Sequence, residues 1–470
     1  MYASTLSKGA PTNAARTQRP VPSPPPAPTG RYAADTVAVT SYLTCTMRYF
    51  AQLPPPGERT DGRQREAAAV HHDANTLRRC FLSLHAERAY DELTDGRTRP
   101  LRLDELVGLA AERFPGLVPS SAQLADEAQH MQRDKEGWEI AVGIFLQAVL
   151  HVPTAGDHLL RSMLRPTPRA CAALHGYQLT GRADLGLATV VRNEGVARLE
   201  LCNPAFLNAE DEAAVEALET GTDLVLLDPA SHVGVLRGAP QTHPSYAGSR
   251  VFCAGINLTH LYGGDISLLG FLLRREAGYI AKFVRGLCLD DTARDGWWPD
   301  ADKPWVGAVD SFAIGGGMQI LPTMDRVVAD DDSWFSLPAM EEGLVPGAAN
   351  MRLLHQVGAR LSRRLIFWGR KLHATDPEAS LFIDETVAAD SMDIAVRKAA
   401  ERLDNPAVGA NRRMLNLAGE PLDHFRRYLA QYAYEQACRL HSPSLINALE
   451  RTWINRDRDP DPSASAGDPL

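Results

Sequence analysis

The sequence lacks the segments and motifs that mark several protein classes. No stretch approaches the roughly 20 apolar residues of a membrane-spanning helix, and the first residues contain no apolar signal core. No Walker loop, GxSxG elbow or spaced GxGxxG occurs. We therefore expect a soluble protein that is neither a P-loop nucleotide hydrolase, an α/β-hydrolase nor a dinucleotide-fold enzyme.

Cysteine is scarce and basic residues are in the minority. The seven cysteines are odd in number and scattered, and no CxxC pair occurs. This pattern favours a reducing, cytoplasmic location and disfavours a cysteine-based metal site. Lys and Arg total 49 against 58 Asp and Glu, a formal net charge of -9, which argues against nucleic acid as the main partner.

The remaining composition and its periodicity indicate a large folded core between polar ends. With 44% hydrophobic and 23% charged residues over 470 positions, the composition is that of an ordinary globular protein. Residues 1–35 contain "RPVPSPPPAPTG" and are predicted to be a disordered leader, as residues 457–470 are predicted to be a disordered tail. Residues 36–184 show apolar positions at helical spacing, which predicts an all-helical N-terminal domain.

From residue 185 to residue 390 the pattern predicts an α/β core. "LGLATVV" and "VARLELC" flank Arg192–Gly195, which is typical of a hairpin. Further strands are predicted, alternating with helices, at "TDLVLLD", "VGVLRGA", "RVFCAG", "PWVGAVDSFAIG" and "DRVVADDDSWFSL". Residues 391–456 return to helical patterns, which we interpret as helices for oligomerisation and for covering a pocket.

The most informative segment is the triple glycine Gly315–Gly317, which follows an apolar strand and precedes a helical pattern. Without a Cβ, these residues let a ligand oxygen approach the main chain, and the helix adds the positive end of its dipole. A second strand ends at Ala254, Gly255 and Ile256 before another helical pattern. Two such turns predict a pair of amides that holds one oxyanion.

Three motifs occur in the order that is found in the crotonase, or enoyl-CoA hydratase/isomerase, superfamily: "VFCAGINL", "SFAIGGGMQ" and "FSLPAMEEGLVPGAANMRL". Residues 185–390 resemble that superfamily. The resemblance implies a spiral of ββα units that binds acyl-CoA thioesters. It also implies that the amides of Ile256 and Gly316 hold the thioester enolate oxygen.

A narrower resemblance extends over most of residues 200–420, in "FLNAED", "HPSYAGSRVF", "FLLRREAGYI", "GGGMQ", "EEGLVPGAAN" and "NRRMLNL". These segments are similar to crotonase-like dioxygenases of glycopeptide-antibiotic precursor synthesis. The resemblance implies 3,5-dihydroxyphenylacetyl-CoA and O2 as substrates, with coenzyme A as part of the substrate and no metal or organic cofactor. It also implies a homotrimer or homohexamer.

Two departures from the hydratase pattern bear on the chemistry. Gln319 and Ala339 occupy the positions of the two glutamates with which hydratases of the superfamily add and remove water. A carboxamide and a methyl group cannot transfer a proton at neutral pH. Asn257 also stands where many relatives carry an aspartate. We therefore expect an enolate that meets a non-protic electrophile, such as O2.

The resemblance assigns further residues to the substrate site. Gln319 lies three positions after Gly316, so it should face the same cavity. Leu344 and Val345 would line an oxygen pocket, or simply pack in the core. Glu210 would contact the phenolic ring, although the residues alone favour a helix N-terminal acid beside an Asn208 cap.

Arg275 shares a predicted helix face with Leu268, Leu272 and Tyr279. The resemblance places Arg275, rather than Arg274, in the substrate site; a solvated face is the alternative. Five further residues predicted to bind substrate lie around the glycine turns: Ala254, Gly255, Asn257, Gly315 and Gly317. We expect His243 and Tyr246 to lie near coenzyme A. We expect Tyr432 and Gln436 to cover the acyl pocket.

Three other interpretations remain open. Glu341 or Glu342 could supply a carboxylate for a different enolate reaction, such as isomerisation or thioester hydrolysis of another acyl-CoA. The loss of both hydratase acids also fits a non-catalytic scaffold that binds acyl-CoA. Finally, "HHD" at His71–Asp73 formally begins an iron-binding pattern, but so short a match is common by chance and lies in the helical extension.

Overall fold

The computed structural model describes residues 22, 24–289 and 300–451. The predicted tail and most of the predicted leader lie outside these residues. The helical region begins at Tyr32, not at the predicted boundary, because Asp35 accepts hydrogen bonds from the backbone N–H groups of Thr29 and Gly30 at 2.7 and 2.9 Å and so fixes the chain at the helix start. Residues 32–35 are therefore helix, which corrects the leader boundary.

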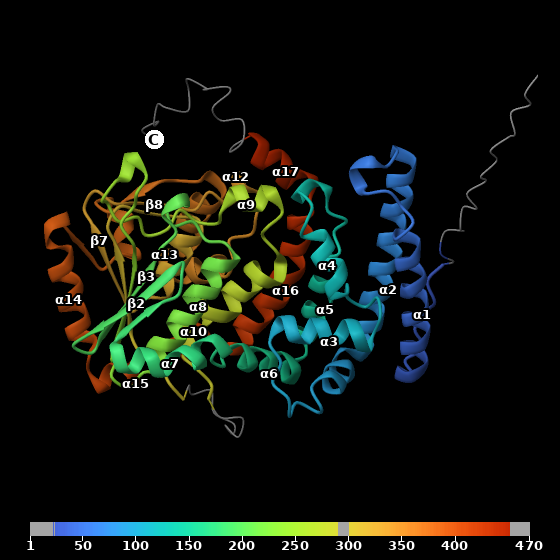
Figure 1. Ribbon diagram of the computed structural model, residues 1–470, viewed down its shortest axis with the longest axis horizontal. Helices are drawn as coiled ribbons and strands as arrows, with labels where there is room; N and C mark the ends of the chain where they lie inside the picture. Colours follow the sequence, from blue (N-terminus) through green and yellow to red (C-terminus); the bar gives the residue numbers. More distant parts are fainter. Residues whose placement is uncertain (1–21, 23, 290–299, 452–470) are drawn as a thin grey trace, which may run out of the picture.

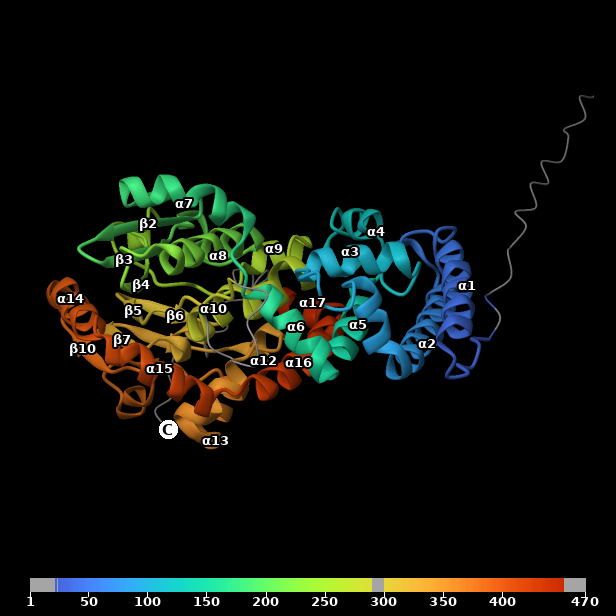
Figure 2. The same cartoon turned by 90° about the horizontal axis from the view of Figure 1, so that it is seen from below.

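The N-terminal region is helical, as predicted, and lies to one side of the sheet (Figures 1 and 2). Thr60 and Ser120 cap α2 and α4 by accepting the N–H groups of Arg63 and Gln123. The helices are α1 (Tyr32–Phe50), α2 (Asp61–Leu93), α3 (Leu103–Arg113), α4 (Ser121–Glu127), α5 (Glu139–His151), α6 (Pro153–Met163) and α7 (Pro168–Thr180).

The core contains a seven-stranded sheet in the order β1-β2-β3-β4-β5-β7-β10 and a three-stranded sheet in the order β6-β8-β9. In the larger sheet, the β1–β2 and β2–β3 pairs are antiparallel and the others are parallel. The strands are β1 (Arg182–Asp184), β2 (Ala188–Asn193), β3 (Val196–Leu201), β4 (Val233–Gly238), β5 (Trp305–Val309), β6 (Phe312–Ile314), β7 (Arg326–Asp330), β8 (Trp334–Ser336), β9 (Leu372–His373) and β10 (Glu385–Val387).

The predicted hairpin is confirmed as β2–β3. Its turn residues Glu194 and Gly195 both have positive φ, at 48° and 82°, which matches the twist of the flanking strands. The remaining α-helices are α8 (Glu212–Leu227), α9 (Leu258–Gly263), α10 (Ala281–Arg285), α11 (Gly316–Ile320), α12 (Ala339–Glu342), α13 (Ala349–Trp368), α14 (Met392–Leu403), α15 (Pro406–Gly419), α16 (Leu422–Leu440) and α17 (Pro443–Leu449). Two π-helices, η5 (Leu268–Leu273) and η6 (Glu276–Ile280), and short 3₁₀ turns complete the described chain: η1 (Pro56–Glu58), η2 (Gln132–Asp134), η3 (Pro204–Phe206), η4 (Pro244–Tyr246), η7 (Leu321–Thr323), η8 (Pro377–Leu381) and η9 (Ala389–Ser391).

Helices cover both faces of the larger sheet. Helix α8 packs on β2 and β3, while α14 packs on β4, β5 and β7 (Figure 2). Alternate residues of β5 serve the two layers: Val306 packs with Met392 and Ala395 of α14, and Trp305 points into the main core. The alternating α/β pattern predicted from the sequence therefore places the sheet between helices.

Two predicted strands are wrong. "TDLVLLD" forms the end of α8, because a short apolar run that is buried on all sides reads alike as strand or helix. "RVFCAG" is not a strand but a connection held by isolated bridges, Pro240 to Arg250 and Cys253 to Ala313. Gly238 explains the irregular course, since a side chain there would overlap the carbonyl of Val251.

Helix α16 joins the N-terminal helices to the core and lies along α5 (Figure 1). The two helices meet at small residues: a Cβ on Gly143 of α5 would lie 2.7 Å from both the carbonyl oxygen of Ala433 and the Cβ of Ala437. The N-terminal helical region therefore buttresses the helix that carries Tyr432 and Gln436.

Among the described residues, no single helix is long and apolar enough to cross a membrane. Helix α5 and the α6–α7 stretch pass such a test only as a pair, and they meet at a bend of 110°. Val142, Phe145 and Leu146 of α5 are each 0% exposed, so packing inside the protein accounts for the apolar character of this helix.

Two glycine substitutions should change the free energy of unfolding in opposite directions. A methyl group on Gly234 of β4 would fall on the indole ring of Trp305, so Gly234→Ala should destabilise the fold by about 1–3 kcal/mol. Gly176 in α7 has nothing within 4 Å of its would-be Cβ, so Gly176→Ala should stabilise by about 0.5–1 kcal/mol. Urea denaturation measures both; equal effects would contradict the described packing of β4 on β5.

Candidate active site

A cavity of about 410 Å³, including its opening to solvent, lies beside the glycine turn that begins α11. All three predicted catalytic residues and several residues predicted to contact substrate lie in its wall. The lining residues are Ile256, Phe271, Leu272, Arg275, Glu276, Gly316, Gln319, Ala339, Glu342, Leu344, Val345, Pro346, Gly347 and Tyr432.

Two glycine turns pack against each other at one side of this cavity. Gly255 has φ +92°, and a Cβ there would lie 3.0 Å from the carbonyl oxygen of Ile314 and 3.3 Å from the amide nitrogen of Gly316. Because Gly315 also has positive φ, at +49°, both turns depend on glycine geometry. The close approach brings the Ile256 and Gly316 backbones together.

The amides of Ile256 and Gly316 are placed to face a ligand. Gly316 is the first residue of α11, where a backbone N–H has no acceptor within the helix. Beside Ile256, a bridge to Glu210 is made by the Gly255 carbonyl and the Asn257 N–H, at 2.7 and 2.8 Å. In a parallel bridge the residue between the two bonded groups points its own N–H away from the partner strand, so the N–H of Ile256 points away from Glu210. That these two amides hold one oxyanion stays a prediction.

Arg275 organises the wall opposite this pair. Its guanidinium is 3% exposed and donates to the Gly316 carbonyl at 2.6 Å, to Gln319 Oε1 at 3.0 Å and to Glu276 Oε1 at 2.9 Å. Burial opposes the charge, but the adjacent Glu210 and other neighbours hold the pKa of Arg275 well above its usual value. Arg274 instead bonds Glu219 at 2.9 Å and does not line the cavity, and the predicted contact of Arg275 with substrate stays a prediction.

Glu210 lies behind Arg275 and is not among the residues that line the cavity, so its predicted contact with a substrate ring stays a prediction. Its carboxylate is 0% exposed, pairs with Arg275 at 2.8 Å and accepts the Tyr279 hydroxyl. Asn208 is not the helix cap, because Asp211 begins α8 and accepts the N–H of Ala214 at 2.9 Å. Glu210 is therefore a buried partner of Arg275, and Gly316 is needed since a Cβ there would lie 2.7 Å from its Oε2.

Gln319 has a defined orientation. Its Oε1 accepts from Arg275, and a guanidinium can only donate, so the amide NH2 of Gln319 is the group available to the cavity. Ala339, in the other hydratase position, also lines the cavity as predicted and is 3% exposed. These two positions therefore present a donor and a methyl group rather than a general acid and base.

Residues from the "GLVPG" loop and α16 close the cavity with largely apolar surface. Leu344, Val345 and Tyr432 line it, as predicted. Burial, followed by the charge of Glu276, raises the pKa of the Tyr432 hydroxyl well above its usual value. Gln436 is 0% exposed and accepts the N–H of Val345 at 3.0 Å, so it supports the wall from behind and does not line the cavity.

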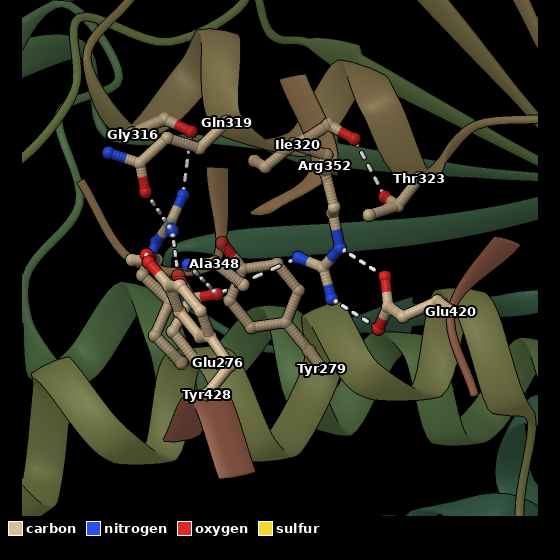
Figure 3. A network of polar contacts seen from close by, with 12 residues as sticks. Glu276, Tyr279, Gly316, Gln319, Ile320, Thr323, Ala348, Arg352, Glu420 and Tyr428 are labelled. Carbon is tan, nitrogen blue, oxygen red and sulfur yellow. Dashed lines mark hydrogen bonds and ion pairs between the residues drawn. The ribbon is translucent and has the colours of Figure 1, made fainter. Parts of the chain in front are cut away.

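Two carboxylates of the cavity wall differ in their partners, and the sequence had not assigned either a role in the leading reaction. Glu276 accepts from Arg275 and from the N–H of Ala348 at 3.0 Å, and lies 3.6 Å from Arg352 (Figure 3). Arg352 in turn bonds Glu420 at 2.8 Å, which extends the network to the start of α16. No periodicity signals Glu276; only its place next to Arg275 could have drawn attention to it.

The second carboxylate belongs to Glu342, the last residue of α12, which the sequence raised only as a group for a different reaction. Its side chain is partly exposed and lines the cavity. Burial in the wall, and then the neighbouring charge of Glu341, raises the pKa of Glu342 to about 7. This carboxyl group can therefore exchange a proton near neutral pH.

Several predicted contacts do not line the cavity. His243 and Tyr246 lie on the loop around η4, where Tyr246 packs on Phe312 with ring centroids 5.5 Å apart. Asn257 caps α9 by accepting the N–H of His260 at 3.1 Å. Ala254, Gly255, Gly315 and Gly317 form the turns that shape the wall, and Gly317 allows close packing on the carbonyl of Cys253. Their predicted contacts with coenzyme A or substrate stay predictions.

The "HHD" segment is remote from this cavity. His71 bonds Glu136 at 2.9 Å, and Glu136 also pairs with Arg59. Among the described residues, only Asp330, Asp331 and Asp332 place three possible metal ligands close together, and these acids begin at the last residue of β7. The structure therefore gives "HHD" a partner within the protein.

The chain is similar in sequence to enzymes that act on acyl-CoA thioesters. Residues 292–424 match the family described as enoyl-CoA hydratase/isomerase. An Amycolatopsis orientalis protein named (3,5-dihydroxyphenyl)acetyl-CoA 1,2-dioxygenase is 52% identical over 399 residues, 84% of this chain and 91% of that protein. A probable enoyl-CoA hydratase of Rhizobium meliloti (strain 1021) is 27% identical, over 46% of this chain and 74% of the relative. The solved enoyl-CoA hydratase of Mycobacterium avium subsp. paratuberculosis K-10 aligns with a TM-score of 0.47 and 19% identity, over 57% of this chain and 98% of its own.

Removing the Arg275 guanidinium should destabilise the fold strongly. Arg275→Met leaves the buried carboxylates of Glu210 and Glu276 without their shared partner, so we expect a loss of about 3–5 kcal/mol in the free energy of unfolding. In a Glu210→Gln background the same change should cost less, by a coupling of about 0.5–3 kcal/mol. Guanidinium denaturation of the four proteins measures this cycle.

The control for this cycle is Arg363→Met. Arg363 is exposed on α13 and bonds only a carbonyl of its own helix, so its replacement should change stability by no more than about 0.5 kcal/mol. Strictly additive effects of the Arg275 and Glu210 substitutions would contradict the described ion pair.

Proposed function

This chain belongs to the enoyl-CoA hydratase/isomerase family, and we propose that within it the protein is a dioxygenase. The proposed reaction converts 3,5-dihydroxyphenylacetyl-CoA and O2 into 3,5-dihydroxyphenylglyoxylate and free coenzyme A. The observation that carries the proposal is the cavity, whose wall brings Ile256 and Gly316, the residues predicted to hold an oxyanion, together with Gln319 and Ala339 at the positions of the hydratase acids. The 52% identity to the Amycolatopsis orientalis dioxygenase supports the choice of substrate.

The first step is formation of a thioester enolate. The methylene group between an aryl ring and a thioester is more acidic than one in an alkyl chain, since the ring shares the negative charge. As its C–H bond breaks, charge moves to the thioester oxygen, which the N–H groups of Ile256 and Gly316 hold. Stabilisation of charge that develops in a dry site is commonly the largest catalytic contribution.

The enolate then transfers its electrons to O2, and a carbon–oxygen bond forms at the α-carbon. The resulting peroxide attacks the thioester carbonyl and expels coenzyme A as its thiolate. Loss of the second α-proton with cleavage of the O–O bond gives the arylglyoxylate, so both oxygen atoms of O2 enter the product. Leu344 and Val345 offer O2 an apolar surface, and the NH2 of Gln319 can donate to a peroxide oxygen.

Three further properties belong to the proposed function: the absence of a cofactor, the location of the enzyme and the use of its product. We propose that the reaction needs no metal ion or organic cofactor, because the enolate itself supplies the electrons that reduce O2. We also propose an intracellular enzyme whose product serves the dihydroxyphenylglycine unit of glycopeptide-type antibiotics. The seven cysteines, which are all free in the structure, support a reducing location.

The decisive experiment follows O2 and free thiol together. Metal-stripped protein, given 3,5-dihydroxyphenylacetyl-CoA in air, should consume one O2 for each coenzyme A thiol released, measured with an oxygen electrode and a thiol reagent. A Gln319→Ala variant should lose about 10²–10³-fold in kcat while its affinity for the thioester changes little, because a donor to developing charge is removed.

The control variant is Gln129→Ala, which removes an exposed amide that lies just after α4 and bonds the carbonyl of Ala125, and it should leave both quantities unchanged. Thiol release without O2 uptake would indicate a thioester hydrolase instead. Binding of the thioester with neither change would indicate a scaffold, and activity that requires added iron would contradict the cofactor-free mechanism.

We further propose assembly into a homotrimer or homohexamer. Helices α13 and α15 leave large apolar side chains exposed, which a second copy would cover: Leu354, Phe367, Trp368, Met414 and Leu415. Light scattering should give three or six times the chain mass, and Trp368→Asp with Leu415→Asp should lower it, whereas Leu84→Asp on α2 should not. A monomeric wild-type protein would contradict this proposal.

A further inference from the structure

Glu342 is unusual among the charged groups of the cavity. Glu276 and Arg275 also line the wall, but each is engaged by neighbouring charges. Within the described chain, the Glu342 carboxylate has neither a hydrogen-bond donor nor an ion-pair partner, although it is largely enclosed. An acid in such a place carries a free energy cost that no contact inside the protein offsets.

The Glu342 carboxylate lies against the oxyanion turns. A Cβ on Gly315 would be 3.4 Å from Glu342 Oε1 and 3.6 Å from the α-carbon of Gly255. One residue after each glycine stands an oxyanion amide, Gly316 and Ile256. A thioester whose carbonyl oxygen occupies the hole therefore has its α-carbon in the same small space as this carboxylate.

The other groups in the wall cannot take a proton from carbon. The carboxamide of Gln319 has no useful pKa, and Arg275 stays charged. Burial raises the pKa of the Tyr432 hydroxyl well above its usual value, so its phenolate is not available near neutral pH. Glu276 is held by Arg275 and by the N–H of Ala348, with Arg352 beyond. Glu342 is left as the one lining carboxylate with free acceptor oxygens among the residues that the structure describes.

We propose that Glu342 is the catalytic base that removes the α-proton of the bound thioester and so forms the enolate. This inference rests on the proposed function and adds to it the residue that starts the reaction. The C–H electron pair moves onto the thioester oxygen in the hole, and the proton moves to Glu342. No acid of the hydratase pattern takes part, since Glu342 lies three positions beyond Ala339 on α12.

The same carboxyl group balances the protons of the whole reaction. Protonated Glu342 gives its proton to the thiolate of the departing coenzyme A, which restores the carboxylate. The carboxylate then takes the second α-proton while the O–O bond breaks, and releases that proton to solvent through the cavity mouth. One group therefore serves twice, and no external reductant or additional acid is needed.

The surroundings suit this role. Glu341 on the same helix adds negative charge, and Arg275, Glu276 and Tyr432 face the cavity from the π-helices and α16. From α16, Arg439 bonds the carbonyl of Gly343 at 2.8 Å rather than the Glu342 carboxylate. With the pKa of Glu342 raised to about 7, the carboxylate is a stronger base than an exposed glutamate and is still deprotonated in half of the molecules at neutral pH.

The test separates proton removal from oxygen chemistry. Wild-type protein and 3,5-dihydroxyphenylacetyl-CoA are mixed without oxygen in D2O, and deuterium at the α-carbon is followed by mass spectrometry. We expect exchange by the wild type, a loss of at least about 10²-fold in Glu342→Gln, and no loss in the control Glu401→Gln, whose exposed side chain on α14 lies outside the cavity. Binding of the thioester by Glu342→Gln should persist.

If Glu342→Gln does not fold, two other measurements test the role of Glu342: the exchange rate of Glu342→Asp and the pH dependence of exchange by the wild type. Exchange by the wild type should fall as the pH drops through about 7, because the base becomes protonated, and Glu342→Asp should retain part of the rate with a shifted profile. Undiminished exchange by folded Glu342→Gln, or wild-type exchange that is flat between about pH 5 and 8, would overturn the proposal.

The proposed function and the Glu342 proposal fail in different ways. A wild type that exchanges deuterium but consumes no O2 in air refutes the dioxygenase function and retains Glu342 as the base. A wild type that consumes O2 while Glu342→Gln does so at the same rate retains the function and refutes the base. Absence of both exchange and O2 uptake in the wild type refutes both.

Discussion

The cavity depends on one buried cation. Arg275 bonds the carbonyl of Gly316, the oxygen of Gln319 and the carboxylates of Glu210 and Glu276, so a single guanidinium orients the oxyanion turn, the cavity amide and the π-helix. Its five donors match this crowded set of acceptors in a way that a lysine could not. The buried charges of Glu210 and Glu276 are therefore compensated by the same side chain that shapes the wall.

The sequence could predict those parts of the site in which a backbone conformation requires a particular residue type. A turn that must approach another backbone requires glycine, so Gly255 and Gly315 are conspicuous in the sequence itself. Gln319 and Ala339 could be recognised as replacements because the motifs of the superfamily have glutamates at these two positions. Leu344 and Val345 lie in that same motif, and all four side chains line the cavity.

The parts that sequence missed depend on tertiary contacts. "TDLVLLD" is apolar enough for either a strand or a helix, and only its packing on β2 and β3 decides for α8. The pairing of Glu210 with Arg275, 65 positions away, has no local signature in the sequence. Glu276 and Glu342 look like ordinary surface acids in the sequence, and the difference between them, one paired and one not, exists only in three dimensions.

The contact between α5 and α16 links the helical N-terminal region to the cavity wall. Gly143 packs against the backbone at Ala433, next to Tyr432 of the cavity wall. A bulkier residue at this position of α5 would displace α16, and with it Tyr432, and so change the volume of the cavity. Evolution could therefore change which aryl ring fits by substitutions in a region that does not line the cavity. Such changes would leave the glycine turns, and with them the chemistry, untouched.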